Sequence, residues 1–366
     1  MLGMQRQWVA RRYQPGDEFQ ILGLRRLVFG DGDEQRNTES HWRWEFQENP
    51  AGRGRIWLAV AGDKVVGQYA VIPVRMQYFG EAMMGSLSLE TMTHPDFRRQ
   101  AVFTTLANRM YEELEREGIP VTHGFPNENS VEGFVTKLGW MYVRSLPVFV
   151  KPLEISRVIG RLIRGRALAH AIGRVSNPLA RVLFRPTHAS RVKRSEVEWI
   201  ERFDARMDAF WRQSAPRRRI TVIRDSTYLN WRYFDNPGRR YWAVVAGSGG
   251  GILGYVILRC MEQSGLHGGM IVDIGALPGR ELELGALLVE VEGFFREQRM
   301  DLIACLISGD DEYSGLLRRS GYMSLPRKLS FKEWHFGCRV HSPALDSEFF
   351  ADPSNWFVTF GDTDVV

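Results

Sequence analysis

The chain has 366 residues, 44% of them hydrophobic and 25% charged, which is typical of globular protein and allows two domains. Its three cysteines lie far apart, which argues against a disulfide framework and a thiolate metal site, and we expect no metal. No segment offers ~20 uninterrupted apolar residues and no signal-like run opens the chain, so we expect a cytoplasmic protein. The formal net charge of +5 suits an anionic partner, without choosing between a nucleotide cofactor, an acidic carrier protein, nucleic acid and a lipid surface.

Strand-like and helix-like patterns alternate from the N-terminus onward. β-Branched runs between turn residues predict strands, and apolar residues spaced by three and four predict helices, two of them ending before Gly118 and Gly139. The predicted strands are 8–13, 56–60, 65–76, 87–93, 121–125 and 140–150, and the predicted helices open near Gly16, at an N-cap Ser40, and over 103–117 and 127–138. This order predicts an α/β (α+β) fold, with a mixed, mostly antiparallel sheet covered by helices on both faces.

A repeated pattern divides the chain into two halves. The segment 44–50, Trp-Glu-Phe-Gln-Glu-Asn-Pro, returns at 231–237 as Trp-Arg-Tyr-Phe-Asp-Asn-Pro, and Glu90 returns as Asp273. Duplication of one unit explains such matches in the same order. We therefore expect two related domains, a linker and a tail, with these limits: 1–153, 154–196 (linker), 197–345 and 346–366 (tail).

The segment 94–104, His-Pro-Asp-Phe-Arg-Arg-Gln-Ala-Val-Phe-Thr, joins a predicted strand to a predicted helix. The start of a helix presents unpaired N–H groups and the positive end of the helix dipole, which together suit a pyrophosphate. Neither a GxGxxG nor a GxxxxGK[ST] pattern is present, so a dinucleotide-binding dehydrogenase and a P-loop NTPase are disfavoured. The sequence predicts an anion-binding loop of another kind.

This loop resembles the motif of the GNAT superfamily of acyl-CoA-dependent N-acyltransferases, Arg/Gln-x-x-Gly-x-Gly/Ala, which follows the fourth strand. Ala101 stands where Gly is usual and Phe103 stands at the last position; Ala101 lets the backbone approach phosphate if its φ is negative. The segments 89–95, 124–129 and 137–140 resemble the neighbouring parts of the superfamily, so the likeness covers the first half and, through the repeat, most of the second. It also resembles tandem bacterial members, down to the tail Gly361 to Val365.

The resemblance implies two GNAT-like domains and an acyl-CoA cosubstrate, with acetyl-CoA as one candidate. Backbone amides on the fourth strand would hold the pantetheine arm, the motif would hold the pyrophosphate, and an Asn at the head of the last helix would contact the arm or simply cap the helix. The implied cofactor-binding residues are Met92, Thr93, Arg98, Arg99, Gln100, Ala101, Val102, Phe103, Thr104, Asn127 and Asn129.

The resemblance also implies catalytic candidates. Glu90 is the candidate general base, acting directly or through water if burial raises its pKa, with a salt-bridging carboxylate as the alternative. Many relatives place a Tyr acid where this chain has Val135. The general acid is therefore water, His123 or Tyr69, although a lone His on a strand is more often structural.

Two further segments are notable for their charge, one acidic and one basic. The second copy of the loop carries Glu281 and Glu283, which would repel a pyrophosphate, so we expect the second half not to bind CoA. The stretch 155–194 holds ten Lys and Arg and no Asp or Glu. It suits a solvated linker helix, an anionic membrane surface or an acyl carrier protein, and nucleic acid least, because no aromatic residues are interleaved in the manner of a stacking platform.

The leading hypothesis is an enzyme that transfers an acetyl or longer acyl group from CoA to the primary amine of a small molecule, such as an amino sugar or amino acid derivative. One alternative is a non-catalytic protein that senses acyl-CoA or an acyl carrier protein. Another is a transferase that forms an amide bond from aminoacyl-tRNA on paired GNAT-like folds.

Overall fold

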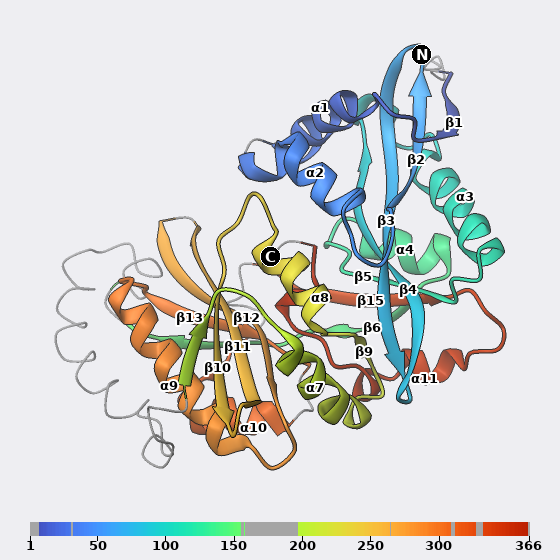
Figure 1. Ribbon diagram of the computed structural model, residues 1–366. Coiled ribbons are helices and arrows are strands. Elements are labelled where there is room, and N and C mark those ends of the chain that lie inside the picture. Colours follow the sequence, from blue (N-terminus) through green and yellow to red (C-terminus); the bar gives the residue numbers. More distant parts are fainter. Residues whose placement is uncertain are drawn as a thin grey trace. The chain divides into compact units, whose positions relative to one another are not determined.

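The computed structural model describes residues 7–30, 32–154, 157, 197–263, 265–308, 312–326 and 332–364 (Figure 1). The basic stretch 155–194 therefore lies, apart from Arg157, outside the described residues. The chain folds as two compact units. Unit 1 comprises Met1–Ser145, Asp235–Arg239 and Trp334–Asn355, and unit 2 comprises Leu146–Phe234, Arg240–Glu333 and Trp356–Val366.

Unit 1 is a mixed sheet with strand order β1-β2-β3-β4-β5-β15-β6. Only β4 and β5 pair in parallel among these neighbours. Helices α1 and α2 cover one face and α3 and α4 the other (Figure 1). The elements are β1 Val9–Arg12, α1 Glu18–Phe29, α2 Glu39–Phe46, β2 Arg55–Ala61, β3 Lys64–Tyr78, β4 Glu81–Thr93, α3 Val102–Arg116, β5 Val121–Gly124, α4 Val131–Leu138, β6 Met141–Ser145, β15 His335–Val340 and α11 Ser347–Ala351, with short 3₁₀ turns at Glu34–Asn37 and Pro95–Phe97.

Local signals explain most of these boundaries. On α3, Leu106, Met110 and Leu114 form one fully buried stripe that packs against the sheet. Gly118 and Gly139 adopt positive φ after α3 and α4, as the sequence predicts. The N-cap of α2 is Thr38 rather than the expected Ser40, because the Thr38 side chain accepts the N–H of His41.

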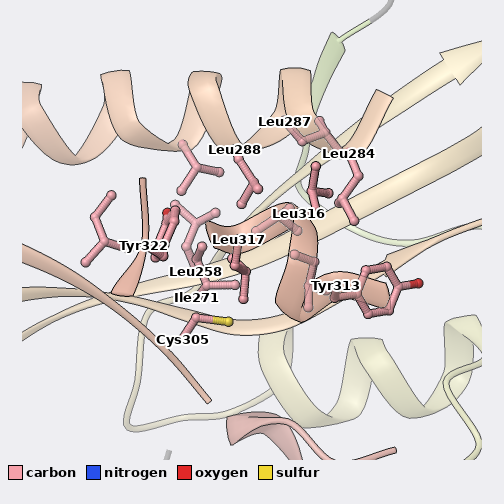
Figure 2. Packing of buried hydrophobic residues seen from close by; sticks show 14 of the residues in the cluster. Leu258, Ile271, Leu284, Leu287, Leu288, Cys305, Tyr313, Leu316, Leu317 and Tyr322 are labelled. Carbon is pink, nitrogen blue, oxygen red and sulfur yellow. The ribbon is translucent and has the colours of Figure 1, made fainter. Parts of the chain in front are cut away.

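Unit 2 repeats this plan with strand order β14-β7-β13-β12-β11-β10-β8 and one parallel pair, β12 with β13. Its core consists of apolar residues from α9 and α10 packed on β11, β12 and β13 (Figure 2). The elements are β7 Val148–Pro152, β8 Val197–Ile200, α7 Ala205–Ser214, β9 Ile220–Val222, α8 Ser226–Leu229, a π-helical turn Asn230–Phe234, β10 Trp242–Ser248, β11 Gly251–Gln263, β12 Leu266–Ala276, α9 Glu281–Glu297, β13 Leu302–Leu306, α10 Glu312–Arg319, β14 Met323–Ser324 and a 3₁₀ turn Phe360–Asp362.

The two units exchange strands that the sequence assigned to the opposite halves. The single strand expected over 140–150 is instead two strands, β6 in the sheet of unit 1 and β7 in the sheet of unit 2. Pro147, which lacks a backbone N–H, stands between them. In return, β15 pairs with β5 and β6 in unit 1. The halves expected from the repeat, 1–153 and 197–345, do not include this exchange.

Candidate active site

The loop between β4 and α3 has an unusual backbone. His94 accepts the N–H of Asp96 through Nδ1, Pro95–Phe97 forms a 3₁₀ turn, and Gln100 Nε2 donates to the carbonyl of Asp96 at 3.0 Å. Arg99 and Ala101 then adopt positive φ values of 62° and 57°. These contacts fix the loop without using its arginines.

The backbone at Ala101 does not meet the condition set from the sequence. A negative φ was the condition for close approach of the backbone to phosphate, but Ala101 is left-handed, with φ 57° and ψ 13°, and is the N-cap of α3. For a residue with a Cβ this conformation costs roughly 1–2 kcal/mol. A left-handed residue followed by a helical one turns successive N–H groups toward a common side, which creates a concavity that suits anions. The loop thus contains this left-handed turn with Ala at position 101, at a conformational cost that Gly would not carry.

The start of α3 is open to an anion. Ala101 provides no side-chain cap, the first turn contains no acidic residue, and the first helical hydrogen bond runs from Thr105 N–H to the carbonyl of Ala101. The N–H groups of the three preceding residues, at 102–104, therefore point out of the helix end. Arg98 and Arg99 are exposed. Neither has a carboxylate partner in the part of the chain that the structure describes.

Packing holds this helix end against the sheet. A Cβ added at Gly67 on β3 would lie 2.4 Å from Cγ1 of Val102, so only glycine lets the first turn of α3 come this close. Phe103, at the end of the motif, packs edge-on against Phe134 at 5.1 Å between ring centroids. The side chains at 102 and 103 thus have packing roles, and their contribution to an anion site would come from their backbone.

Beside this loop, the parallel strands β4 and β5 separate. Their pairing ends at Ser88 opposite Gly124, whereas β4 continues to Thr93. A β-bulge lies in β4 at Glu90, whose φ is 48°, and the register with β3 shifts at this point. Met92 is buried and Thr93 half-buried. The edge of β4 that faces β5 is therefore unpaired just where the sequence placed the pantetheine contacts.

Glu90 is held by two arginines. Its Oε1 accepts from Nε of Arg25 at 2.7 Å and from Nη2 of Arg36 at 3.0 Å, and its side chain is 4% exposed. Arg25 also donates to the side chain of Asn37. This geometry corresponds to the salt-bridging alternative: the carboxylate anchors α1 and the following turn to the bulge. Both arginines were missed in the sequence, because 65 and 54 positions separate them from Glu90.

The two candidate acids are both buried. His123 on β5 lies against the rings of Phe125 and Phe336, and burial lowers its pKa to about 4, so it is neutral near pH 7. Burial raises the pKa of Tyr69 on β3 to about 12. A neutral imidazole cannot supply a proton from the imidazolium form, and the phenol of Tyr69 holds its proton firmly.

Tyr69 belongs to a buried chain of hydrogen bonds that the sequence did not reveal. Ser88 donates to its hydroxyl at 3.0 Å, the hydroxyls of Tyr69 and Tyr111 lie 2.8 Å apart, and Trp140 donates to Tyr111 at 2.7 Å. Ser88 is also the last residue of β4 that pairs with β5. The chain therefore connects the point where the strands separate to the core beneath α3.

The candidate asparagines lie before α4. Asn127 and Asn129 are exposed, and Oδ1 of Asn127 accepts the N–H of Asn129 at 3.0 Å. The N-cap position of α4 is Ser130, which makes no side-chain cap. Asn127 thus stabilises the turn into α4 with its oxygen.

Unit 2 has the opposite charge at the matching loop. Glu281 and Glu283 lie in the first turn of α9, and Glu283 forms an ion pair with Arg280 at 3.1 Å. Carboxylates near a helix N-terminus already satisfy the dipole and would repel a phosphate. The start of α9 therefore differs from that of α3, whose first turn contains no acidic residue.

Unit 1 thus combines a bulged strand that extends beyond its parallel neighbour with a helix start that has no carboxylate in its first turn and two exposed arginines before it. Residues 9–143, which lie in this unit, match the family described as "Acetyltransferase (GNAT) domain". A sequence search of curated proteins gave no match. Among the described residues, no group of three or more His, Cys, Asp or Glu side chains could hold a metal ion.

Solved structures of low identity share the fold over most of the chain. A GCN5-related N-acetyltransferase from Anabaena variabilis matches with a TM-score of 0.63 and 12% identity, covering 92% of this chain and 73% of that one. A fungal GCN5-related glucosamine N-acetyltransferase region matches with 0.56 and 12%, covering 92% and 38%. Saccharomyces cerevisiae N-myristoyltransferase with bound myristoyl-CoA matches with 0.60 and 11%, covering 93% and 84%. In the described part of the chain, no helix is both long and apolar enough to cross a membrane.

Proposed function

We propose that the protein is an acyl-CoA-dependent N-acyltransferase, with its donor site at the loop 94–104 of unit 1. The observation that supports this most is the open start of α3, where free N–H groups and two exposed arginines stand beside the unpaired edge of β4. A pyrophosphate at the helix start gains from the dipole and from charge-assisted bonds to Arg98 and Arg99. The pantetheine arm then extends along β4.

The reaction is direct attack of the acceptor amine on the thioester carbonyl. The C–N bond forms, the C–S bond breaks, and the thiolate of CoA leaves and takes up a proton. Met92 and Thr93 lie in the part of β4 beyond its pairing with β5. N–H groups alternate between the two edges of a strand, and His94 N–H donates to Val66 on β3, so the N–H of Thr93 is the one directed to the open edge, where it could hold the arm or bond the oxyanion. Glu90 contributes indirectly, because its two ion pairs fix the bulge. Since His123 and Tyr69 are buried, the proton of the amine leaves to water and the thiolate is protonated by water.

The acceptor class is a primary amine on a small molecule. The match to a glucosamine N-acetyltransferase region supports an amino sugar as the first acceptor to try. The match to N-myristoyltransferase with myristoyl-CoA supports including long-chain donors beside acetyl-CoA. An acyl carrier protein as a partner, through the basic stretch 155–194, remains a proposal about residues that the structure does not describe.

A second candidate is a protein that binds acyl-CoA without turning it over. Val135, 37% exposed, stands where relatives place a Tyr acid, and both other acid candidates are buried. A sensor would keep the binding loop and would need no proton-transfer group.

The test measures free CoA thiol released from acetyl-CoA and myristoyl-CoA, with a panel of amines that includes glucosamine. We expect amine-dependent release by the full chain, reduced at least 100-fold in Arg98→Glu. Arg109→Glu is the matched control, because Arg109 is an exposed arginine on α3 outside the loop; it should keep wild-type activity. Binding of acyl-CoA without amine-dependent release would favour the sensor, and no binding of either thioester would contradict both candidates.

A further inference from the structure

The residues 356–363 are buried throughout and belong to unit 2. Their backbone pairs with two segments: Phe357 N–H donates to the carbonyl of Ile220, and Val358 accepts the N–H of Ser308, each at 3.0 Å. Thr359 also forms an antiparallel bridge with Ile307. The tail therefore adds an extended strand to unit 2 instead of lying loosely on its surface.

This strand lies where β12 and β13 separate. Their parallel pairing ends at Ile271 opposite Cys305, while β12 continues to Ala276. Thr359 pairs with the residue that follows β13 and donates through Oγ1 to Asp273 on β12 at 3.4 Å. The tail thus contacts both sides of the gap between the two strands.

The gap is equivalent to the one in unit 1. In unit 1 the parallel pairing ends at Ser88, two positions before the bulge residue Glu90; in unit 2 it ends at Ile271, two positions before Asp273. The register with the preceding strand shifts at both places. The same opening of the sheet is therefore present twice, and unit 2 fills it with its own peptide.

Specific contacts hold the tail in this gap. Arg224 donates to Asp362 at 2.7 Å and to both oxygens of Asp273, so one buried guanidinium ties the tail to β12. Arg232 donates to the carbonyls of Gly361, at 3.1 Å, and of Thr363. These donors recognise backbone carbonyls and a carboxylate, which are the acceptors of a peptide.

Gly361 shows how closely the tail fits. A Cβ added there would lie 2.0 Å from the hydroxyl of Tyr233 and 3.3 Å from a carboxylate oxygen of Asp273. Tyr233 itself donates to Asp273 at 3.1 Å and is fully buried. The gap therefore selects a glycine at this point of its ligand.

We propose that unit 2 is a peptide-binding module whose ligand is the chain's own tail, the segment 356–364, which is extended up to Thr359 and forms a 3₁₀ turn at Phe360–Asp362. This segment, with its row of backbone carbonyls, takes the place that the pantetheine arm takes in unit 1. The proposed peptide site is supported by the contacts of Arg224, Arg232 and Gly361. Only the comparison with the pantetheine arm rests on the proposed function.

The test uses the full chain, folded first and then cut at a protease site installed at the exposed Asp352. The released fragment, 353–366, should stay bound and co-elute with the remainder of the chain. A labelled synthetic peptide of the same sequence should exchange into the site and report its dissociation constant. If the fragment with an otherwise wild-type sequence dissociates from the rest of the chain immediately after cutting, the proposal is overturned.

Two substitutions in the fragment distinguish specific binding of the tail from non-specific binding. Gly361→Ala should weaken binding at least tenfold, because the added methyl meets Tyr233. Asp364→Ala is the matched control and should leave binding within twofold. Equal affinity of the two variants would contradict a specific site.

If the installed site disturbs folding, uncut full-length variants give the same answer. Chymotrypsin should cleave the tail of Gly361→Ala at least ten times faster than that of the wild type or of Gly293→Ala, a glycine in α9 with open space around it. Equal protection would overturn the proposal. Titration of the wild-type chain with acetyl-CoA tests the proposed function independently. If the wild type does not bind acetyl-CoA, the proposed function is contradicted, and the conclusion about the tail does not change.

Discussion

Units 1 and 2 both have a point where the parallel pairing of two strands ends, but the residues around this point differ. In unit 1 the neighbouring helix start has no side-chain cap, the two arginines before it are exposed and have no carboxylate partner among the described residues, and β4 extends beyond its pairing with β5. In unit 2 the helix start carries Glu281 and Glu283, and the gap holds the tail. The fold that the two units share therefore does not by itself determine what each unit binds. On the proposed functions, the charge of one loop and the course of one terminal segment determine which ligand each unit takes.

The buried carboxylates at the two bulges show a second difference. Glu90 has two arginines to itself. Asp273 shares the single Arg224 with Asp362, and burial raises the pKa of Asp273 while Arg224 opposes the rise. The buried carboxylate at the bulge of unit 2 is therefore paired with one arginine, which it shares, whereas the carboxylate at the bulge of unit 1 is paired with two.

The largest effect should come from removing that shared cation. Arg224→Met leaves two buried carboxylates without a guanidinium and should lower the free energy of unfolding by about 4 kcal/mol. Urea denaturation followed by the fluorescence of the chain's tryptophans measures this loss.

Arg25→Met is the matched change in unit 1. Because Arg36 still pairs with Glu90, the loss should be smaller, about 2 kcal/mol. Equal losses in the two variants would break the comparison, since they would show that the second arginine on Glu90 contributes nothing.

Acid should destabilise unit 1 through His123. Its folded pKa of about 4 lies below the unfolded value of about 6.5, so the unfolded chain takes up the proton first as the pH falls. The stabilisation is complete above pH 6.5 and is lost between about 6.5 and about 4. Between pH 7 and pH 5 this group should cost about 2 kcal/mol of unfolding free energy.

The measurement compares urea denaturation at the two pH values. His123→Leu should reduce the difference between them by about that amount. His341, whose pKa is also lowered to about 4 by burial, changes stability in the same direction and should still do so in the variant. An unchanged pH difference in His123→Leu would contradict the assignment.

The smallest expected effect concerns the loop. Ala101→Gly removes the strain of a left-handed Ala, and after the entropy of the more flexible unfolded chain it should raise the unfolding free energy by roughly 0.5 kcal/mol. Ala107→Gly, in the interior of the same helix, should lower it by roughly 1 kcal/mol. Thermal unfolding of the two variants should therefore shift in opposite directions, and a shared direction would contradict the strain at Ala101.

Elements with a local signal were predictable from the sequence. Helix α3, expected at 103–117, spans Val102–Arg116, and the loop that leads into it is where the motif placed it. Its backbone was not predictable, because a residue with a Cβ seldom adopts the positive φ that Ala101 has. The mixed sheet with helices on both faces followed from the order of elements.

Features set by contacts between distant residues could not be predicted. Strands β6 and β7 look like one strand in sequence, and only the pairing partners assign them to different sheets. The arginines on Glu90 come from other elements, so the sequence could not reveal that this carboxylate is paired. The repeat showed that Asp273 matches Glu90, yet nothing in it indicated that the tail would reach Asp273.

The most direct test of the account is calorimetric titration of the full chain with acetyl-CoA, comparing Arg98→Glu in unit 1 with Arg280→Glu in unit 2. The account predicts one molecule bound per chain, binding lost in Arg98→Glu and a dissociation constant within twofold of the wild type in Arg280→Glu. Two molecules bound per chain, or binding lost only in Arg280→Glu, would contradict the claim that unit 1 alone holds the donor site.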